Sequence, residues 1–233
     1  MQKVYDEKNY IIGELEKTIM RAARVFCELS DSEFESVLIR GVARRERYER
    51  GVTVAEAESK QSEFMILLTG RIQGVRDHED GKQDFVQLFV PGEVCGLDIV
   101  CSVTRRCPFR LQALDECDLV FINYDGIFCD NISRAEERNL RKGITQALAN
   151  ESLRRLHKID VLYRKALRER VLVYLRNLSI ITGSTSLELN MDREQFAQYL
   201  GVNRSALSHE LANMRNDGLI EFYKSSFKIL KDM

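Results

Sequence analysis

The feature that most constrains the fold is a stretch of helical periodicity between residues 134 and 162. No proline interrupts it, Gly143 is its one weak position, and Ser133 followed by Glu136 is typical of a helix N-terminus. A helix of about 30 residues is longer than a small domain is wide, so part of its apolar stripe needs a partner. A second copy of the chain is the natural partner, although Asn150, Glu151 and Ser152 interrupt the stripe. The apolar residues of this stripe are Leu140, Ile144, Ala147, Leu148, Leu153, Leu156, Ile159 and Leu162.

Residues 42–124, which precede this helix, have the pattern of a β domain. Short apolar runs such as "EFMILLTG" and "PGEVCGLDIV" alternate with turn residues, and Asp80-Gly81 is a strong hairpin signal. The glycines that separate the runs are Gly70, Gly74, Gly81, Gly92 and Gly96. Strands at this spacing predict a small antiparallel barrel or jelly roll, preceded by helices within residues 11–40.

Residues 192–217 predict two short helices joined by a tight turn. The first helix runs from Arg193 to Leu200, with Asp192 as its cap, and ends at Gly201, which can adopt a positive φ. The second begins near Asn203 and stops before Gly218. The following "LIEFYKSSFKIL" predicts a hairpin of two strands around Lys224. This is the pattern of a winged helix-turn-helix, a fold that inserts its second helix into the major groove of DNA.

The outer side of the second helix carries short or basic polar side chains. Recognition helices read bases with their first turns, where Arg204 can donate a bidentate pair to guanine worth about 1–3 kcal/mol. The residues expected to contact DNA are Asn203, Arg204, Ser205, Ser208, His209 and Lys224. The charge distribution agrees, because residues 161–233 carry a net charge of +3 while the whole chain carries −1. We therefore expect double-stranded DNA as a partner.

Composition excludes several other classes. No apolar run approaches the roughly 20 residues that a membrane span requires, and the first 20 residues lack the core of a secretory signal. We expect a cytoplasmic protein that does not contact a membrane. Its six cysteines include no C-x-x-C pair and are expected to be reduced thiols, with no metal site. No catalytic grouping, P-loop or nucleophile elbow is present, so we do not expect an enzyme.

At this point the chain resembles the Crp–Fnr family of bacterial transcription regulators. The resemblance rests on "FMILLTGRI" and "PGEVCG" in the β region and, more specifically, on "DREQFAQYLGVNRSALSHELANMRNDGLI". It implies an α+β fold in three parts: an effector-sensing β-roll of the cyclic-nucleotide-binding type with N-terminal helices (1–130), a long dimerisation helix (131–162) and a winged helix-turn-helix (163–233). It further implies a homodimer on a palindromic operator, RNA polymerase as a partner, and a small-molecule effector whose signal reaches the recognition helix through the dimer helix.

The resemblance also assigns roles within the recognition helix. Arg204, Ser205 and Ser208 match positions at which family members contact bases and phosphates. His209 stands where members commonly have an arginine. A histidine is shorter and makes one contact rather than a fork, which leaves the preferred DNA sequence open.

The predicted effector site departs from the cyclic-nucleotide pattern. Gly92 and Gly96 are kept, but Leu97 replaces the ribose-binding glutamate, and Cys107-Pro108 replace the phosphate-binding arginine and serine. Arg105 and Arg106 lie two residues earlier and are the candidates for binding another anion. Cyclic AMP is therefore disfavoured. An iron–sulfur cluster is disfavoured too, since Cys27 is the one cysteine near the N-terminus, and the effector remains unknown.

Besides an enzyme with a cysteine nucleophile, which no Cys/His/Asp grouping supports, a second alternative function stays open at this stage. The chain could be a cyclic-nucleotide-like ligand-binding module that regulates a protein partner, with the C-terminal part contacting that protein. The distinguishing property is salt dependence, because phosphate neutralisation releases counterions and DNA affinity falls steeply with salt.

Overall fold

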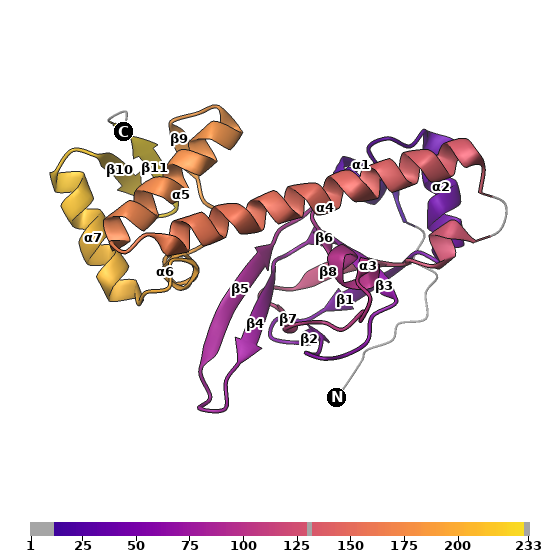
Figure 1. The fold of residues 1–233 in the computed structure, drawn as a ribbon, viewed down its shortest axis with the longest axis horizontal. Helices are drawn as coiled ribbons and strands as arrows, with labels where there is room; N and C mark the ends of the chain where they lie inside the picture. Colours follow the sequence, from indigo (N-terminus) through magenta and orange to yellow (C-terminus); the bar gives the residue numbers. More distant parts are fainter. Residues whose placement is uncertain (1–11, 130–131, 231–233) are drawn as a thin grey trace. The chain divides into compact units, whose positions relative to one another are not determined.

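The structure, a computed structural model, describes residues 12–129 and 132–230. The chain divides into two compact units, one formed by Met1–Gly74 with Phe89–Leu148 and the other by Val75–Leu88 with Ala149–Met233 (Figure 1). The Asp130 and Asn131 positions, where the predicted roll and helix meet, lie outside the described residues.

Two antiparallel four-stranded sheets form the β-roll, with strand orders β1-β8-β3-β6 and β2-β7-β4-β5. Their strands are β1 Arg44–Tyr48, β2 Thr53–Ala55, β3 Glu63–Thr69, β4 Ile72–Asp77, β5 Gln83–Phe89, β6 Val94–Cys95, β7 Arg110–Ala113 and β8 Cys117–Asn123. The accompanying helices are α1 Glu14–Ala22, α2 Asp31–Arg40, α3 Leu97–Cys101 and the 3-10 turns Arg24–Phe26 and Gly126–Phe128. The predicted β-roll with N-terminal helices is confirmed.

Strand β1 is built from "RRERY", a sequence with little apolar character. It pairs with β8, and ion pairs to neighbouring segments hold its arginines. Arg44 donates to Glu63 at 2.9 Å, and Arg45 lies 3.0 Å from both Glu16 and Asp118. These long-range partners stabilise a strand that hydrophobic alternation does not predict.

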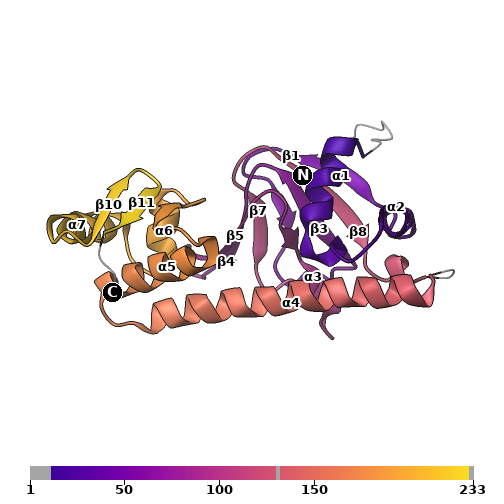
Figure 2. The same cartoon turned by 90° about the horizontal axis from the view of Figure 1, so that it is seen from above.

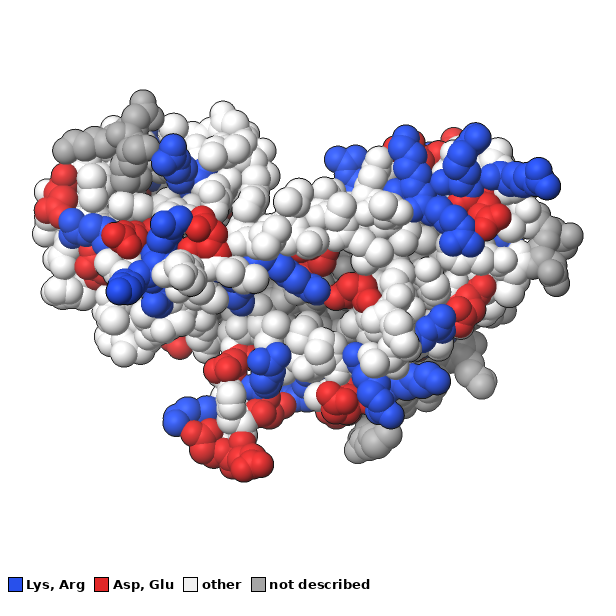
Figure 3. All heavy atoms as spheres, viewed as in Figure 1, with Lys and Arg blue, Asp and Glu red and all other residues white. Residues whose placement is uncertain are grey.

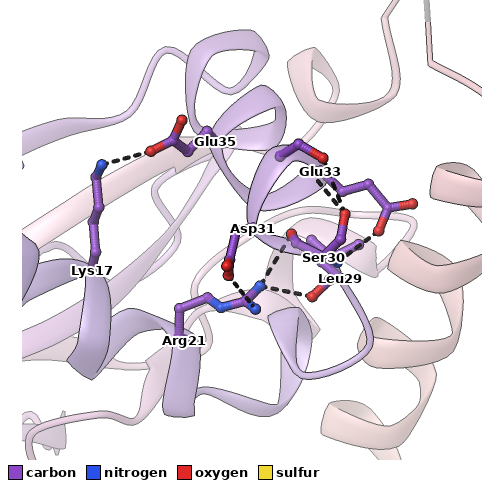
Figure 4. A network of polar contacts seen from close by, with 8 residues as sticks. Lys17, Arg21, Leu29, Ser30, Asp31, Glu33 and Glu35 are labelled. Atoms are coloured by element: carbon purple, nitrogen blue, oxygen red, sulfur yellow. Dashed lines mark hydrogen bonds and ion pairs between the residues drawn. The ribbon is translucent and has the colours of Figure 1, made fainter.

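The N-terminal helices α1 and α2 are joined by a polar network on their outer side (Figure 4). The Lys17 ammonium donates to Glu35 at 2.7 Å, and Arg21 donates to Asp31 at 2.9 Å and to the carbonyl of Leu29 at 2.8 Å. Ser30 caps α2 by accepting from the backbone N–H of Glu33. The network fixes the angle between the two helices above the buried core of this unit.

The segment "PGEVCGLDIV" is less β-rich than the sequence predicts. Its strand β6 has two residues, and Leu97–Cys101 form helix α3. Gly96 adopts φ 78°, a left-handed conformation that suits glycine, and turns the chain from the strand into the helix. Helix α3 buries Leu97, Ile99 and Val100. A buried strand would be equally apolar, so the apolar content of this segment did not distinguish a strand from a helix.

The predicted long helix is α4, Arg134–Tyr163, which is unbroken over 30 residues (Figure 2). The backbone N–H of Glu136 donates to the Ser133 hydroxyl at 3.1 Å, as the predicted cap requires. The Glu136 carboxylate is buried and pairs with Arg40 of α2. A methyl group at Gly143 would lie 2.3 Å from the carbonyl oxygen of Val25, so glycine is needed here for close packing.

The second unit continues from Ala149 of α4 into a winged helix-turn-helix. Its other elements are α5 Leu167–Thr182, β9 Ser186–Glu188, α6 Arg193–Tyr199, α7 Arg204–Asn216, β10 Ile220–Tyr223 and β11 Ser226–Ile229. The three strands form an antiparallel sheet in the order β10-β11-β9. The predicted winged helix-turn-helix is confirmed as well. Within the described residues, no helix is both long and apolar enough to cross a bilayer.

Candidate nucleic-acid interface

Capping interactions fix the helix pair α6–α7 at three points: the start of α6, the turn between the helices and the start of α7. Asp192 accepts from the backbone N–H of Gln195 at 2.9 Å, and the Gln195 side chain accepts in return from the Asp192 backbone. Gly201 adopts φ 70°, which lets the next backbone N–H, that of Val202, donate back to Ala197 at 3.0 Å. Asn203 caps α7, since its side-chain oxygen accepts from the N–H of Ala206 at 2.8 Å.

One face of the two helices forms the core of the motif. Ala197 is fully buried, which permits the close approach of the helices that its small side chain suggests. The other fully or almost fully buried side chains are Phe196, Leu200, Leu207, Leu211 and Met214. With this face turned inward, the opposite face of α7 is directed to solvent.

The outward face of α7 brings the predicted polar residues together. Arg204, Ser205, Ser208 and His209 are all exposed. Arg204 is the first residue of α7, where the free backbone N–H groups add a positive end of the helix dipole. Glu210, the acidic residue of the helix, is turned to α5 and lies 2.6 Å from Arg168. The first two turns therefore present cationic and hydroxyl groups without a competing carboxylate.

Two of the expected contact residues are already bonded to each other. The Ser205 hydroxyl donates to the side-chain oxygen of Asn203 at 2.7 Å, the same oxygen that caps α7. Asn203 is thus primarily a cap. His209 Nδ1 lies 3.3 Å from the amide nitrogen of Asn213, so its ring is oriented by the next turn of the helix.

Arg193 is a residue that the sequence interpretation missed. Its guanidinium lies beside the stacked rings of Phe222 and Phe227 of the wing, 5.2 and 5.3 Å from their centroids, and donates to the carbonyl of Lys224 at 2.7 Å. Burial, and then the nearby charge of Arg204, lower the pKa of Arg193. The positive charge of Arg204 therefore acts unfavourably on that of Arg193. An arginine beside a capping aspartate and two wing phenylalanines is the signal that could have identified it.

Lys224 occupies the wing turn that the sequence predicted. It adopts φ 52°, and its ammonium lies 5.5 Å from the ring centroid of exposed Tyr223. Because Arg193 holds its carbonyl, the wing tip is tied to the start of α6. The structure thus joins Lys224 to Arg193 and, through it, to the charge of Arg204.

The predicted effector residues lie in the first unit, around α3. Gly92 and Gly96 both adopt positive φ on either side of β6. Arg105 makes a bidentate pair with Asp125 at 2.6 and 2.8 Å, and Arg106 donates to the carbonyl of Glu58 at 2.6 Å. Both guanidinium groups are thus held by the protein itself, and their role toward an effector stays a prediction.

Of the three positions that depart from the cyclic-nucleotide pattern, two are apolar core positions here, while Pro108 is exposed. Leu97 and Cys107 are buried, and burial raises the pKa of the Cys107 thiol. A raised pKa lowers the reactive thiolate fraction, which is the opposite of what a thiol sensor needs. The six cysteines are free thiols. In the described part of the chain, no three His, Cys, Asp or Glu side chains gather to hold a metal ion.

Comparisons with known proteins match both units. Residues 45–128 match the cyclic nucleotide-binding domain, and residues 169–232 match the Crp-like helix-turn-helix domain. The chain is 23% identical over 223 residues to transcriptional activator protein FnrL of Cereibacter sphaeroides, covering 90% of this chain and 85% of that protein. It is 25% identical over 174 residues to nitrogen fixation regulation protein FixK of Azorhizobium caulinodans, covering 72% and 67%.

A solved structure supports the same fold. The c-di-GMP responsive global regulator CLP of Xanthomonas campestris superposes with a TM-score of 0.65 at 18% identity, over 87% of this chain and 100% of that one. The helix-turn-helix match favours DNA over a protein as the target of the C-terminal part. Regulators of this family bind DNA and act as dimers. The chain belongs to the Crp–Fnr family of transcription regulators, with a cyclic nucleotide-binding-like domain and a helix-turn-helix DNA-binding domain.

Proposed function

We propose that two copies of this chain bind a palindromic DNA duplex, each inserting the N-terminal end of α7 into the major groove. The observation that carries this is the exposed face of Arg204, Ser205 and Ser208 beside the charge of Arg193. Arg204 reads a base, in the bidentate manner that guanine favours. Ser205 and Ser208 are short enough to let the helix approach closely, and His209 makes a single contact to a base edge or phosphate.

The wing and the cap complete the proposed interface. Lys224, at the tip of the wing, neutralises a backbone phosphate, while Asn203 offers its amide N–H₂ group to another. Contacts of this kind fix the register of the protein on the duplex, and the base contacts of α7 supply the sequence preference.

We further propose that α4 is the dimer helix. Leu153, Leu156, Ile159 and Tyr163 recur along one side of its second half and are 54, 55, 60 and 86% exposed in the single chain. An apolar stripe left in water at this spacing is typical of a helix that packs against a copy of itself.

The remaining parts of the proposal concern regulation. Residues 1–130 sense an effector of unknown identity, residues 131–162 carry its signal between the two copies, and residues 163–233 bind the operator in the cytoplasm, next to RNA polymerase. Arg105 and Arg106, with Gly92 and Gly96, are the proposed effector residues. An anion that recruits Arg105 has to displace Asp125, which links occupation of the site to the segment that precedes α4.

The test uses a duplex selected from a random library by the full-length chain. Arg204→Ala should weaken binding of that duplex by about 1–3 kcal/mol and relax preference at one base pair in each half-site, with the dimer unchanged. Arg176→Ala, which removes an exposed arginine of α5, is the matched control and should leave affinity within a factor of about two. Equal affinities for wild type and Arg204→Ala would contradict the assignment.

A further inference from the structure

The DNA-binding unit contains a piece of chain that comes from the β-roll sequence. Residues 75–88, the β4–β5 hairpin, belong to the second compact unit. Phe85 of β5 is 8% exposed and lies in the same apolar core as Val161 of α4, Phe196 of α6 and Leu200, which caps α6. The core of the winged helix-turn-helix is therefore completed by a side chain from a distant segment.

A lysine of α4 is inserted at the same point. The Lys158 ammonium donates to the carbonyl of Val86 and lies 5.5 Å from the ring centroid of Phe85 and 4.9 Å from that of Tyr199, the last residue of α6. A lysine in this position bridges the hairpin to α6 by a hydrogen bond on one side and cation–π contact on both. Lysine is rarely buried without a carboxylate partner, and here backbone and aromatic groups take that place.

Electrostatics agree with this description of the site. Burial lowers the pKa of Lys158 to about 8, and the carboxylate of Asp84 on the hairpin acts in the opposite direction. Burial raises the pKa of Tyr199 to about 12, while Arg154 on α4 lowers it, so the phenol stays neutral. A second polar contact lies about two turns earlier on α4, where Gln87 donates to Glu151 at 3.2 Å.

The hairpin is not built to bind DNA itself. Its end carries four acidic residues, Asp77, Glu79, Asp80 and Asp84, against the two basic residues Arg76 and Lys82, and Figure 3 shows red and blue side chains together there. Such a tip would repel phosphate. Besides the pairing of β4 with β7 in the sheet, the hairpin contacts α4 and α6.

From this geometry we propose that residues 83–88 act as a latch on the DNA-binding unit, closed by Phe85 and Lys158, that positions the recognition helix through Tyr199. Tyr199 directly precedes the Leu200-Gly201 turn that sets the direction of α7. A displacement of the hairpin therefore changes the position of the Leu200-Gly201 turn through the side chains of Lys158 and Tyr199. Lys158, Phe85 and Tyr199 are positioning residues in this scheme. Of the two experiments that test the latch, only the measurement of DNA affinity rests on the proposed function.

The first experiment measures amide hydrogen exchange of the full-length chain without DNA. Lys158→Ala and Phe85→Leu should each speed exchange about tenfold, both in residues 83–88 and in α6, because the lost contacts join the two segments. Lys158→Arg keeps the charge and the donor and should restore most of the protection. Lys165→Ala removes an exposed lysine just beyond α4 and should change neither segment. Faster exchange confined to the hairpin overturns the latch.

The second experiment measures affinity for the duplex selected by the wild-type chain. Lys158→Ala and Phe85→Leu should each change affinity at least threefold, and the double variant should change it no more than the larger single effect, since both open the same contact. Additive effects, or affinities equal to that of Lys165→Ala, overturn the proposal. Circular dichroism shows whether each variant is folded. If no duplex is selected by the wild-type chain, the proposed function fails while the exchange experiment still decides the latch.

Discussion

Replacing Gly143 by alanine tests whether tertiary packing outweighs helix propensity in α4. Alanine is favoured over glycine inside a helix by about 1 kcal/mol, so local propensity predicts a more stable protein. In the structure, however, a Cβ at this position would lie 2.3 Å from the carbonyl oxygen and 2.9 Å from the carbonyl carbon of Val25. The Val25 residue is fully buried in a 3-10 turn, so its backbone has little freedom to retreat.

The magnitude follows from the two opposing effects. Overpacking against a rigid neighbour costs about 1–3 kcal/mol, and here the neighbour is backbone rather than the flexible end of a side chain. Because the neighbour is backbone, the cost falls in the upper part of this range, about 2–3 kcal/mol, and subtracting the propensity gain of about 1 kcal/mol leaves a net loss of about 1–2 kcal/mol. For a chain of this length, that loss corresponds to a fall in Tm of about 2–8 °C.

The assay is thermal unfolding followed by far-ultraviolet circular dichroism, since the chain has no tryptophan for fluorescence. Protein concentration is held fixed, because dimerisation makes Tm depend on it. Asn150→Ala, at an exposed position of the same helix, is the control and should raise Tm slightly through propensity alone. A Gly143→Ala protein that melts at or above the wild-type temperature would refute the packing argument.

Three further predictions concern other parts of the structure. Glu136→Gln should lower the free energy of unfolding by about 3 kcal/mol, measured by urea denaturation, because it leaves the buried Arg40 charge without its partner. Stability should rise by about 1–2 kcal/mol between pH 8 and pH 10 in the wild type and not in Lys158→Met, with thermal melts as the measurement. Burial lowers the pKa of Lys158 to about 8, so above this pH the lysine is protonated more in the unfolded chain than in the folded one, and folding stability rises with pH. The half-buried ammonium keeps some contact with water, which limits this gain in stability. Leu156→Glu should convert the dimer to monomer in analytical ultracentrifugation, and a variant that stays dimeric would argue against the α4 stripe as the interface.

The helix-turn-helix could be predicted from sequence because its determinants are local. Asp192 and Gln195 form a capping box three residues apart, and Gly201 supplies the positive φ between two periodic segments. Each of these signals acts within a few residues along the chain. Because these local signals agree, the helix-turn-helix and the solvent-facing side of α7 could be predicted from sequence.

The parts that could not be predicted depend on distant residues. Strand β1 has no hydrophobic alternation, and its arginines are held by Glu63 and Asp118, which lie many residues later in the sequence. The position of Arg193 beside a capping aspartate is a weak signal alone, and its role depends on Phe222 and Phe227 of the wing, which are distant in sequence. Hydrophobic patterning does not predict such contacts, because the groups that make them are polar or come from separate segments.

The difference between local signals and long-range contacts also explains why the sequence predicts the DNA-binding face but not the effector. Counting positions places Arg105 and Arg106 two residues before the cyclic-nucleotide phosphate pattern, but only the fold shows what each one contacts. Arg105 adopts φ 51° and is held by two bonds to Asp125, whereas one carbonyl holds Arg106. A weakly bound anion competes poorly with a bidentate carboxylate, since charge-assisted pairs are the stronger ones. Arg106 is therefore the guanidinium that an anionic effector would recruit first, and its single bond to the Glu58 carbonyl is the contact that such a ligand has to replace.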